Sequence, residues 1–362
     1  MSMWARPGKC NGPCLVKLDT IFDEQHITNS LTLDSYIRYA ISSFEATLEY
    51  LQRNFAELAE MSQKMGEFAT ALATGSVQVV ECCFKNAENE NEVAELMNYS
   101  SHEGNNSLIV SVINSHLDLF IYLSGKGLDI NHQNLKGDTA LHYCSKNNLI
   151  EFSTLIRNDK RSLILRNVDG YSALHQSLIM GHEKITEILA SPDSVNLLTN
   201  LNESAFMFVK TRRDVELMFT NGGNANVQPY FDIFPFLYHC KSGNIAVATA
   251  FCEFGDKFNL NFEVSDEKGR NFLHFCSHLN LIGPISQFRC LLIKNPKKYT
   301  RVFRMITHLQ NNCLHAASFA GNFECLRLLL DMGLDPWKRN SQGYTPAELS
   351  TNDSNRTYIE GT

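Results

Sequence analysis

The stretch Gly137-Asp-Thr-Ala-Leu-His142 returns thirty-three residues later as Gly170-Tyr-Ser-Ala-Leu-His175, and Gly104 stands one such interval before the first copy. A fixed period of this length is typical of proteins built from stacked structural repeats. A single repeat cannot cover its own apolar face, so its neighbours must cover it. We therefore predict an array of helical repeats, which offers a long grooved surface and contains no built-in catalytic cleft.

The apolar residues of the copies keep the same phase, as the core between stacked repeats requires. The leucine before the motif histidine recurs at Leu141, Leu174, Leu273 and Leu314. A second helix in each repeat is expected to be filled by Leu155, Ile156, Ile188, Leu189, Leu329 and Leu330. Gly181 supplies a left-handed turn before such a second helix at no steric cost. Asn148, of the residue type that tolerates this conformation next best, stands there in the preceding copy.

From about residue 104 to residue 348 the chain resembles ankyrin repeats. Besides the two stretches above, a good copy is Asn312-Cys-Leu-His-Ala-Ala317, and the half copy Gly343-Tyr-Thr-Pro-Ala-Glu348 closes the array. The resemblance implies an all-α ankyrin-repeat solenoid. Its unit is a hairpin-like turn, a short helix, a tight turn and a longer antiparallel helix.

The other copies are weaker. Residues 202–227 are one residue short in phase, and residues 234–261 match the motif poorly. Residues 268–293 recover the motif as Gly269-Arg-Asn-Phe-Leu-His274, and then we expect the pattern to break at Gly283-Pro284. An insertion over residues 294–308 follows.

Before the array, apolar residues recur at steps of four and three from Ile37 to Leu58. This heptad seam predicts a long amphipathic helix. The helix either forms a coiled coil that makes a homodimer or folds back onto the array or a neighbouring helix, and both remain open. We divide the chain into an irregular arm 1–31, a heptad helix 32–65, a degenerate capping repeat 66–103, an ankyrin array 104–348 with the basic insertion 294–308, and a tail 349–362.

The composition excludes several classes of protein. A net charge of −7 argues against a general nucleic-acid binder, which needs a positive field. The cysteine count of 11 is odd and most cysteines lie in apolar patterns, so a disulfide scaffold is not expected and a reducing, cytoplasmic compartment fits. The N-terminal residues lack the apolar core of a secretory signal, and no apolar run reaches the length of about eighteen residues that spans a membrane.

Residues with catalytic or metal-binding chemistry are present, but their spacing favours structural roles. The motif histidines His142, His175, His274 and His315 repeat in phase. Packed helices lie about 8–10 Å apart, far beyond zinc–ligand distances of about 2 Å. In ankyrin repeats this histidine bonds the backbone of the adjacent turn, and we expect the same here. The pair Cys10 and Cys14 has no second pair at metal-ligand spacing. We expect no cofactor, no metal and no enzymatic activity.

The resemblance places the binding surface on the concave face, formed by hairpin tips and the exposed side of the first helices. By motif phase we expect a protein partner to contact Tyr143, Lys146, Asn147, Arg166, Asp169, Gln176, Ile179, Phe319, Trp337, Lys338 and Arg339. Of these, the aromatic residues Tyr143, Phe319 and Trp337 are the candidate anchors, or each simply packs against its neighbour.

A basic cluster in the insertion is the local anomaly of this acidic chain. It consists of Lys294, Lys297, Lys298, Arg301 and Arg304. It is either a solvated connection or a docking site for an acidic peptide, a phosphoinositide headgroup or a membrane surface. The function we expect is that of a non-catalytic intracellular adaptor or scaffold. The alternatives are a regulatory or substrate-recruiting part of a larger enzyme, such as a kinase, GTPase regulator, lipase or ubiquitin ligase, and membrane or trafficking recruitment through this cluster.

Overall fold

The structure is a computed structural model that describes residues 48–49, 61–229 and 233–361. The chain divides into two units, Met1–Gly66 and Glu67–Thr362. Residues 48–49 and 61–66 of the first unit are helical. The remainder of the predicted heptad helix, and the pair Cys10 and Cys14, lie outside the described residues.

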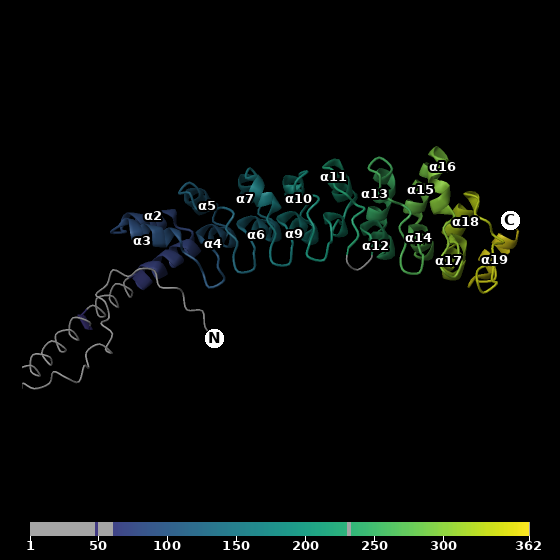
Figure 1. The fold of residues 1–362 in the computed structure, drawn as a ribbon, viewed down its shortest axis with the longest axis horizontal. Coiled ribbons are helices and arrows are strands. Elements are labelled where there is room, and N and C mark those ends of the chain that lie inside the picture. Colours follow the sequence, from purple (N-terminus) through teal and green to yellow (C-terminus); the bar gives the residue numbers. More distant parts are fainter. Residues whose placement is uncertain (1–47, 50–60, 230–232, 362) are drawn as a thin grey trace, which may run out of the picture. The chain divides into compact units, whose positions relative to one another are not determined.

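The second unit consists of helices joined by loops, as Figure 1 shows. Helical residues 67–74 lead into α2 (Val77–Lys85) and α3 (Glu90–Met97). The following helices form pairs: α4 (Ser107–Ile113) with α5 (Leu117–Ser124), α6 (Ala140–Asn147) with α7 (Ile150–Ile156), α9 (Ala173–Met180) with α10 (Glu183–Leu189), α12 (Pro235–Lys241) with α13 (Ile245–Gly255), α14 (Phe272–His278) with α15 (Ile282–Lys294), and α17 (Cys313–Ala320) with α18 (Phe323–Asp331). Two short helices, α8 (Lys160–Ile164) and α16 (Pro296–Phe303), follow second helices, and α19 (Asp353–Glu360) comes last.

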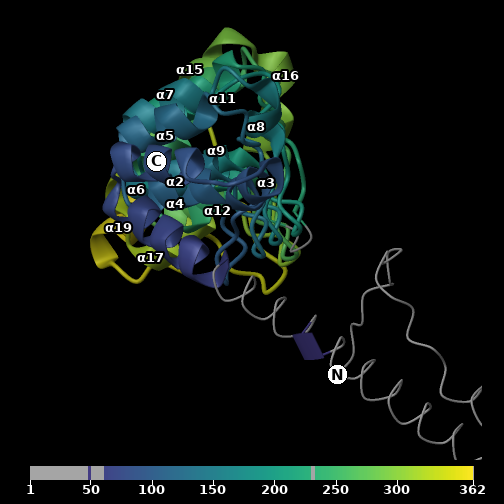
Figure 2. The same ribbon diagram turned by 90° about the vertical axis from the view of Figure 1, so that its left-hand side faces the viewer.

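The pairs stack in chain order, each first helix against the next first helix and each second helix against the next second helix. Helix α6 contacts α9, α14 contacts α17, and α13 contacts α15. Figure 2 looks along the stack and shows the two layers, with the loops before the first helices projecting to one side. Within the described residues, β pairing is limited to isolated bridges at the bases of these hairpin loops, such as Arg166 with Ser172. The prediction of an all-α repeat array is confirmed.

The core lies between successive repeats. Leu141, Leu174, Leu273 and Leu314 are all buried, as their shared phase predicted. The second helices follow the prediction less closely, because Leu155 is 45% exposed and only its neighbour Ile156 is buried. The predicted left-handed turns are present at Asn148 (φ 57°) and Gly181 (φ 79°).

The repeat over residues 202–227 departs from the expected pair. Its first helix is reduced to a single 3-10 turn, η2 (Ala205–Met207), which precedes α11 (Arg212–Thr220). The second helix begins eight residues after the cap Ser204 in this copy and eleven residues after the cap Ser172 in the preceding one, so there is no room for a full first helix. Phe206 of this turn is buried against Phe219 of α11, with ring centroids 4.7 Å apart.

Residues 234–261 form a complete helix pair despite their poor match to the motif. Phe236 takes the place of the motif leucine and lies 4.8 Å from the ring of Phe272 in the next repeat. Phe251 of the second helix packs on Phe236 at 5.5 Å. In this repeat, contacts between buried aromatic rings therefore replace the leucine packing and the side-chain cap of the first helix that the motif supplies in the other copies.

The expected break at Gly283-Pro284 was wrong, because both residues lie in the first turn of α15. Proline has no backbone N–H, but an N–H in the first turn of a helix has no helical partner, so proline is tolerated there. A side chain at Gly283 would place its Cβ 2.6 Å from Thr249 Oγ1, so this glycine allows α15 to approach α13 closely. Within the predicted tail, α19 contains the buried Ile359, and its Tyr358 ring lies 5.1 Å from that of Phe323 in α18.

Candidate partner-binding groove

Three of the four motif histidines join their own helix to the next hairpin loop. The Thr139 N–H donates to His142 Nδ1 at 3.2 Å, so the proton of the neutral ring is on Nε2. Nε2 donates to the Tyr171 carbonyl at 2.9 Å. Burial lowers the pKa of His142, which keeps the ring neutral and preserves both bonds.

The same link recurs where the repeats keep the period. His274 donates to the Asn311 carbonyl at 3.0 Å, and His315 donates to the Tyr344 carbonyl at 3.1 Å. His175 is the exception, because the next repeat is one residue short. Its buried Nε2 lies near the Leu197 backbone without a hydrogen bond of normal geometry. The structural role predicted for the motif histidines is confirmed for His142, His274 and His315.

The hairpin tips are joined by a second row of bonds. The Val168 N–H donates to the Lys136 carbonyl at 3.0 Å, and the Ser341 N–H donates to the Leu309 carbonyl at 2.9 Å. Asn340 donates its side-chain amide to Asn311 Oδ1 at 2.9 Å. These bonds fix each hairpin loop against its neighbour.

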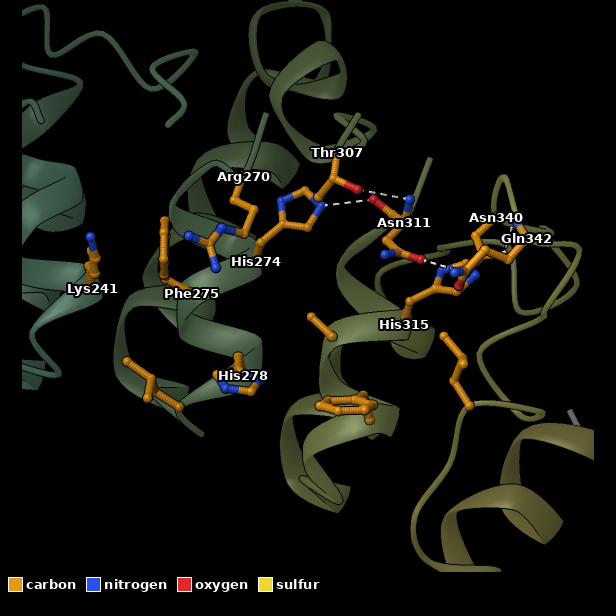
Figure 3. Close-up of a pocket in the computed structure, with 14 residues that line it drawn as sticks. Lys241, Arg270, His274, Phe275, His278, Thr307, Asn311, His315, Asn340 and Gln342 are labelled. Carbon is orange, nitrogen blue, oxygen red and sulfur yellow. Dashed lines mark hydrogen bonds between the residues drawn. The ribbon is translucent and has the colours of Figure 1, made fainter. Parts of the chain in front are cut away.

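A groove of about 500 Å³ opens between the first helices α12, α14 and α17 and two hairpin loops (Figure 3). We call it the α14–α17 groove. Its lining is Lys241, Arg270, His274, Phe275, His278, Leu279, Thr307, Asn311, His315, Ala316, Phe319, Asn340, Gln342 and Leu349. His274 and His315 are among these residues, so two of the histidine links between repeats form part of the groove wall.

Aromatic and cationic side chains lie together in this groove. The guanidinium carbon of Arg270 lies 4.7 Å from the centroid of the Phe275 ring, within cation–π range. The His278 ring stacks on Phe319 of the neighbouring helix, with centroids 6.5 Å apart and planes 18° apart. Phe319 nevertheless remains 58% exposed. The groove therefore presents apolar faces that are partly open to solvent.

Some of the predicted contact residues lie in or beside the groove. Phe319 lines it. Burial lowers the pKa of His315, the bond to the Tyr344 carbonyl raises it, and the positive charge of Lys338 lowers it further. Lys338 therefore lies near the groove wall. Arg339 donates to Glu348 at 3.1 Å. Trp337, on the same tip, is 56% exposed.

The predicted residues in the earlier repeats already make contacts within the array. Lys146 Nζ donates to Asp138 at 2.7 Å and lies 5.5 Å from the centroid of the Tyr143 ring. The Tyr143 hydroxyl accepts from Asn134 at 3.0 Å, and the tyrosine is only half exposed. These interactions serve the array itself, so Tyr143 is a weaker anchor candidate than Phe319.

The remaining predicted residues lie in the α6 and α9 repeats and form no cluster. Asn147 and Asp169 are exposed, whereas Gln176 and Ile179 are half-buried. Arg166, also exposed, donates to the Leu198 carbonyl at 2.7 Å and so links its tip to the next.

Sequence reasoning missed most of the groove. Phe275 and His278 stand one and four residues after His274, the same offsets that selected Tyr143 and Lys146 after His142. Applying the phase to this repeat would have found both. Lys241 sits at the same offset in the repeat that matched the motif poorly, and Arg270 carried no signal.

The basic insertion is an ordered helix rather than a solvated connection. Tyr299, Val302 and Phe303 of α16 are buried. Lys298 pairs with Asp256 at 2.7 Å, and Arg301 pairs with Glu263 at 3.2 Å. Lys298 and Arg301 therefore attach α16 to the preceding repeat, whereas Lys294, Lys297 and Arg304 are exposed.

Across residues 61–229 and 233–361, together with 48–49, no group of three or more His, Cys, Asp or Glu side chains is placed to hold a metal ion. Of the helices described, none has the length and apolar character that crossing a membrane requires.

Comparison with known proteins agrees with this geometry. Family models for ankyrin repeats match residues 108–200 (three copies) and residues 314–348 (many copies). Over 90 residues the chain is 29% identical to the protein fem-1 homolog A-like of Mus musculus. That match covers 25% of this chain and 14% of the mouse protein, so the similar region is a small part of it. The stacked helix pairs, the histidine-linked hairpins and these matches together show that the chain contains ankyrin repeats.

Proposed function

We propose that this protein is a non-catalytic intracellular adaptor that binds protein partners through the face formed by its first helices and hairpin loops. Ankyrin repeats are protein-interaction modules, and the α14–α17 groove is a concave site on that face, which supports the proposal. The proposal rests on the observation that residues of three successive first helices and two hairpin loops line this groove.

The groove has the properties of a preorganised binding site. Its loops are joined by the Asn340–Asn311 bond, and its helices by the histidine links to Asn311 and Tyr344. A partner that docks here does not have to order these elements, so less of the binding energy is lost to entropy. Phe319 is the proposed central anchor and Trp337 a second one, since exposed aromatic side chains dominate the energy of protein interfaces.

The cysteines support a reducing compartment. Those buried in the array are Cys144, Cys240, Cys252, Cys276, Cys313 and Cys325, and all are free thiols. Each behaves as a small apolar core residue. A fold that packs thiols in this way needs no disulfide, which is the usual situation in the cytosol.

Affinity purification followed by mass spectrometry tests the proposal. The bait proteins are the intact chain, the double variant Phe319→Ala/Trp337→Ala and the control Leu155→Ala, which removes a similarly exposed apolar side chain from the second helix α7. We expect a group of proteins captured by the intact chain and the control but lost from the double variant. If all three baits capture the same proteins, the first-helix face is not the binding surface.

A further inference from the structure

The charge of the α14–α17 groove is opposite to that of the protein. The chain has 39 Asp and Glu against 32 Lys and Arg. Yet the fourteen residues that line the groove include no Asp or Glu, while they include Lys241 and Arg270. Lys338 lies close enough for its charge to affect His315 in the groove wall.

The positive charge of the groove results from the residue types at fixed positions of the repeat. The residue before the helix cap is Asp138 in the α6 repeat and Arg270 in the α14 repeat. In the α6 repeat the buried Asp138 accepts from Lys146, and the two charges neutralise each other. In the α14 repeat no carboxylate occupies that position, so the cations of the groove have no acidic counterpart in its lining.

Carboxylates near the groove are already engaged with cations. Arg270 donates to Asp266 Oδ2 at 2.8 Å and also contacts it through its second guanidinium nitrogen at 2.6 Å. Burial raises the pKa of Asp266, but the bonds from Arg270 outweigh burial and hold this pKa below its usual value. Glu348 pairs with Arg339. Among the described residues, Lys241 forms no ion pair, and it is exposed.

We propose that the α14–α17 groove binds an acidic peptide segment of a partner protein, in which an aromatic or aliphatic side chain lies between Asp or Glu residues. This inference rests on the proposed function and specifies the partner's chemistry. Carboxylates of the peptide pair with Lys241 and Arg270, which keeps guanidinium donors beyond those used by Asp266. The apolar side chain packs on Phe275 and Phe319.

The distribution of the cations favours a peptide over a single phosphate group. Lys241 lies on α12, whereas Arg270 precedes α14, as Figure 3 shows. Packed helices are about 8–10 Å apart, so these cations are spread along the groove instead of converging on one point. An extended peptide advances about 3.3 Å per residue and brings alternate side chains to both. The amide of Gln342, exposed at the groove edge, is available to its backbone.

The test is selection from a random peptide library displayed on phage, with the full-length protein as bait. Enriched peptides are then synthesised with fluorescein, and binding is measured by fluorescence anisotropy. The variants are Lys241→Glu and Phe319→Ala, with Lys184→Glu as control. Lys184 is an exposed lysine on the second helix α10, so its reversal makes the same change in net charge away from the groove.

We expect the intact protein to enrich peptides that carry Asp or Glu around an apolar side chain. Lys241→Glu should weaken their binding at least tenfold, Phe319→Ala should weaken it by a similar factor, and Lys184→Glu by less than twofold. Enrichment of neutral or basic peptides whose binding depends on Phe319 would overturn the acidic preference and leave the proposed function standing. Failure to enrich any peptide, or enrichment of peptides insensitive to every substitution, would overturn this inference and count against the groove as a binding site.

Discussion

Mild acid should destabilise this protein through its buried histidines. Burial lowers the pKa of His175, His239 and His274 from 6.5 to about 4 in each case. The unfolded chain therefore binds protons that the folded chain excludes between these two pKa values, and stability is lost as the pH falls from about 6.5 to about 4. At about pH 5 each histidine costs about 2 kcal/mol, so the three together cost about 6 kcal/mol. This is comparable with the whole stability of many domains, about 5–15 kcal/mol.

Urea denaturation followed by far-ultraviolet circular dichroism at about pH 7.5 and about pH 5 measures this loss. Carboxylates with a lowered pKa, such as Asp256, lose their contribution only below the ordinary aspartate pKa of 3.8, so they do not obscure this window. The control is His239→Gln, since glutamine retains an N–H donor for the Phe206 carbonyl that His239 bonds at 2.9 Å and does not titrate. Its loss between the two pH values should be smaller by about 2 kcal/mol. An equal loss in the variant, or no loss in the intact protein, would refute the reasoning.

Other predictions concern single positions, each checked by denaturant unfolding. His142→Ala should cost about 2–4 kcal/mol, because it leaves the buried Thr139 N–H without a partner and removes the bond to the Tyr171 carbonyl of the next repeat. His175→Ala should cost about 1 kcal/mol less, because its ring lacks the inter-repeat bond, and equal costs would contradict this role of the link. Leu174→Ala should lower the free energy of unfolding by about 2–5 kcal/mol, because Leu174 is buried in the core. Leu155→Ala, at a 45% exposed position, should lower it by less than about 1 kcal/mol, and the reverse order would disprove the assigned register. Gly170→Ala should lower the free energy of unfolding by at least about 1 kcal/mol, because φ is +84° at this position and the added Cβ would lie 2.4 Å from the Asn200 backbone nitrogen. An unchanged stability would show that this hairpin has a different backbone conformation.

The sequence predicted the fold wherever the repeat keeps its period. A leucine and a histidine in fixed phase, with Asn148, Gly181 or Gly321 closing the first helix, were sufficient to locate α6, α9 and α17. The prediction was poorest for α12 and α13. There the stabilising contacts are between phenylalanine rings of different repeats, such as Phe236 and Phe272, and no local motif encodes them.

The groove was predictable only in part. Phe319 followed from motif phase, and the same offsets applied to the α14 repeat lead to Phe275 and His278. The absence of acidic residues from the lining could not be predicted, because it depends on which loops and helices of three repeats meet around one cavity. The ion pairs of α16 with Asp256 and Glu263 likewise join residues distant in sequence.

The junction between α9 and η2 divides the array into sections that need not unfold together. In stacked repeats, cooperativity passes only through contacts between neighbours. At this junction the first helix is a single 3-10 turn and His175 makes no bond to the next loop, so coupling there is weaker than at the α14–α17 boundary. The repeats beyond η2, which contain the groove, can then remain folded while the earlier ones open. Truncation or mechanical pulling from the N-terminal side would thus spare the α14–α17 groove.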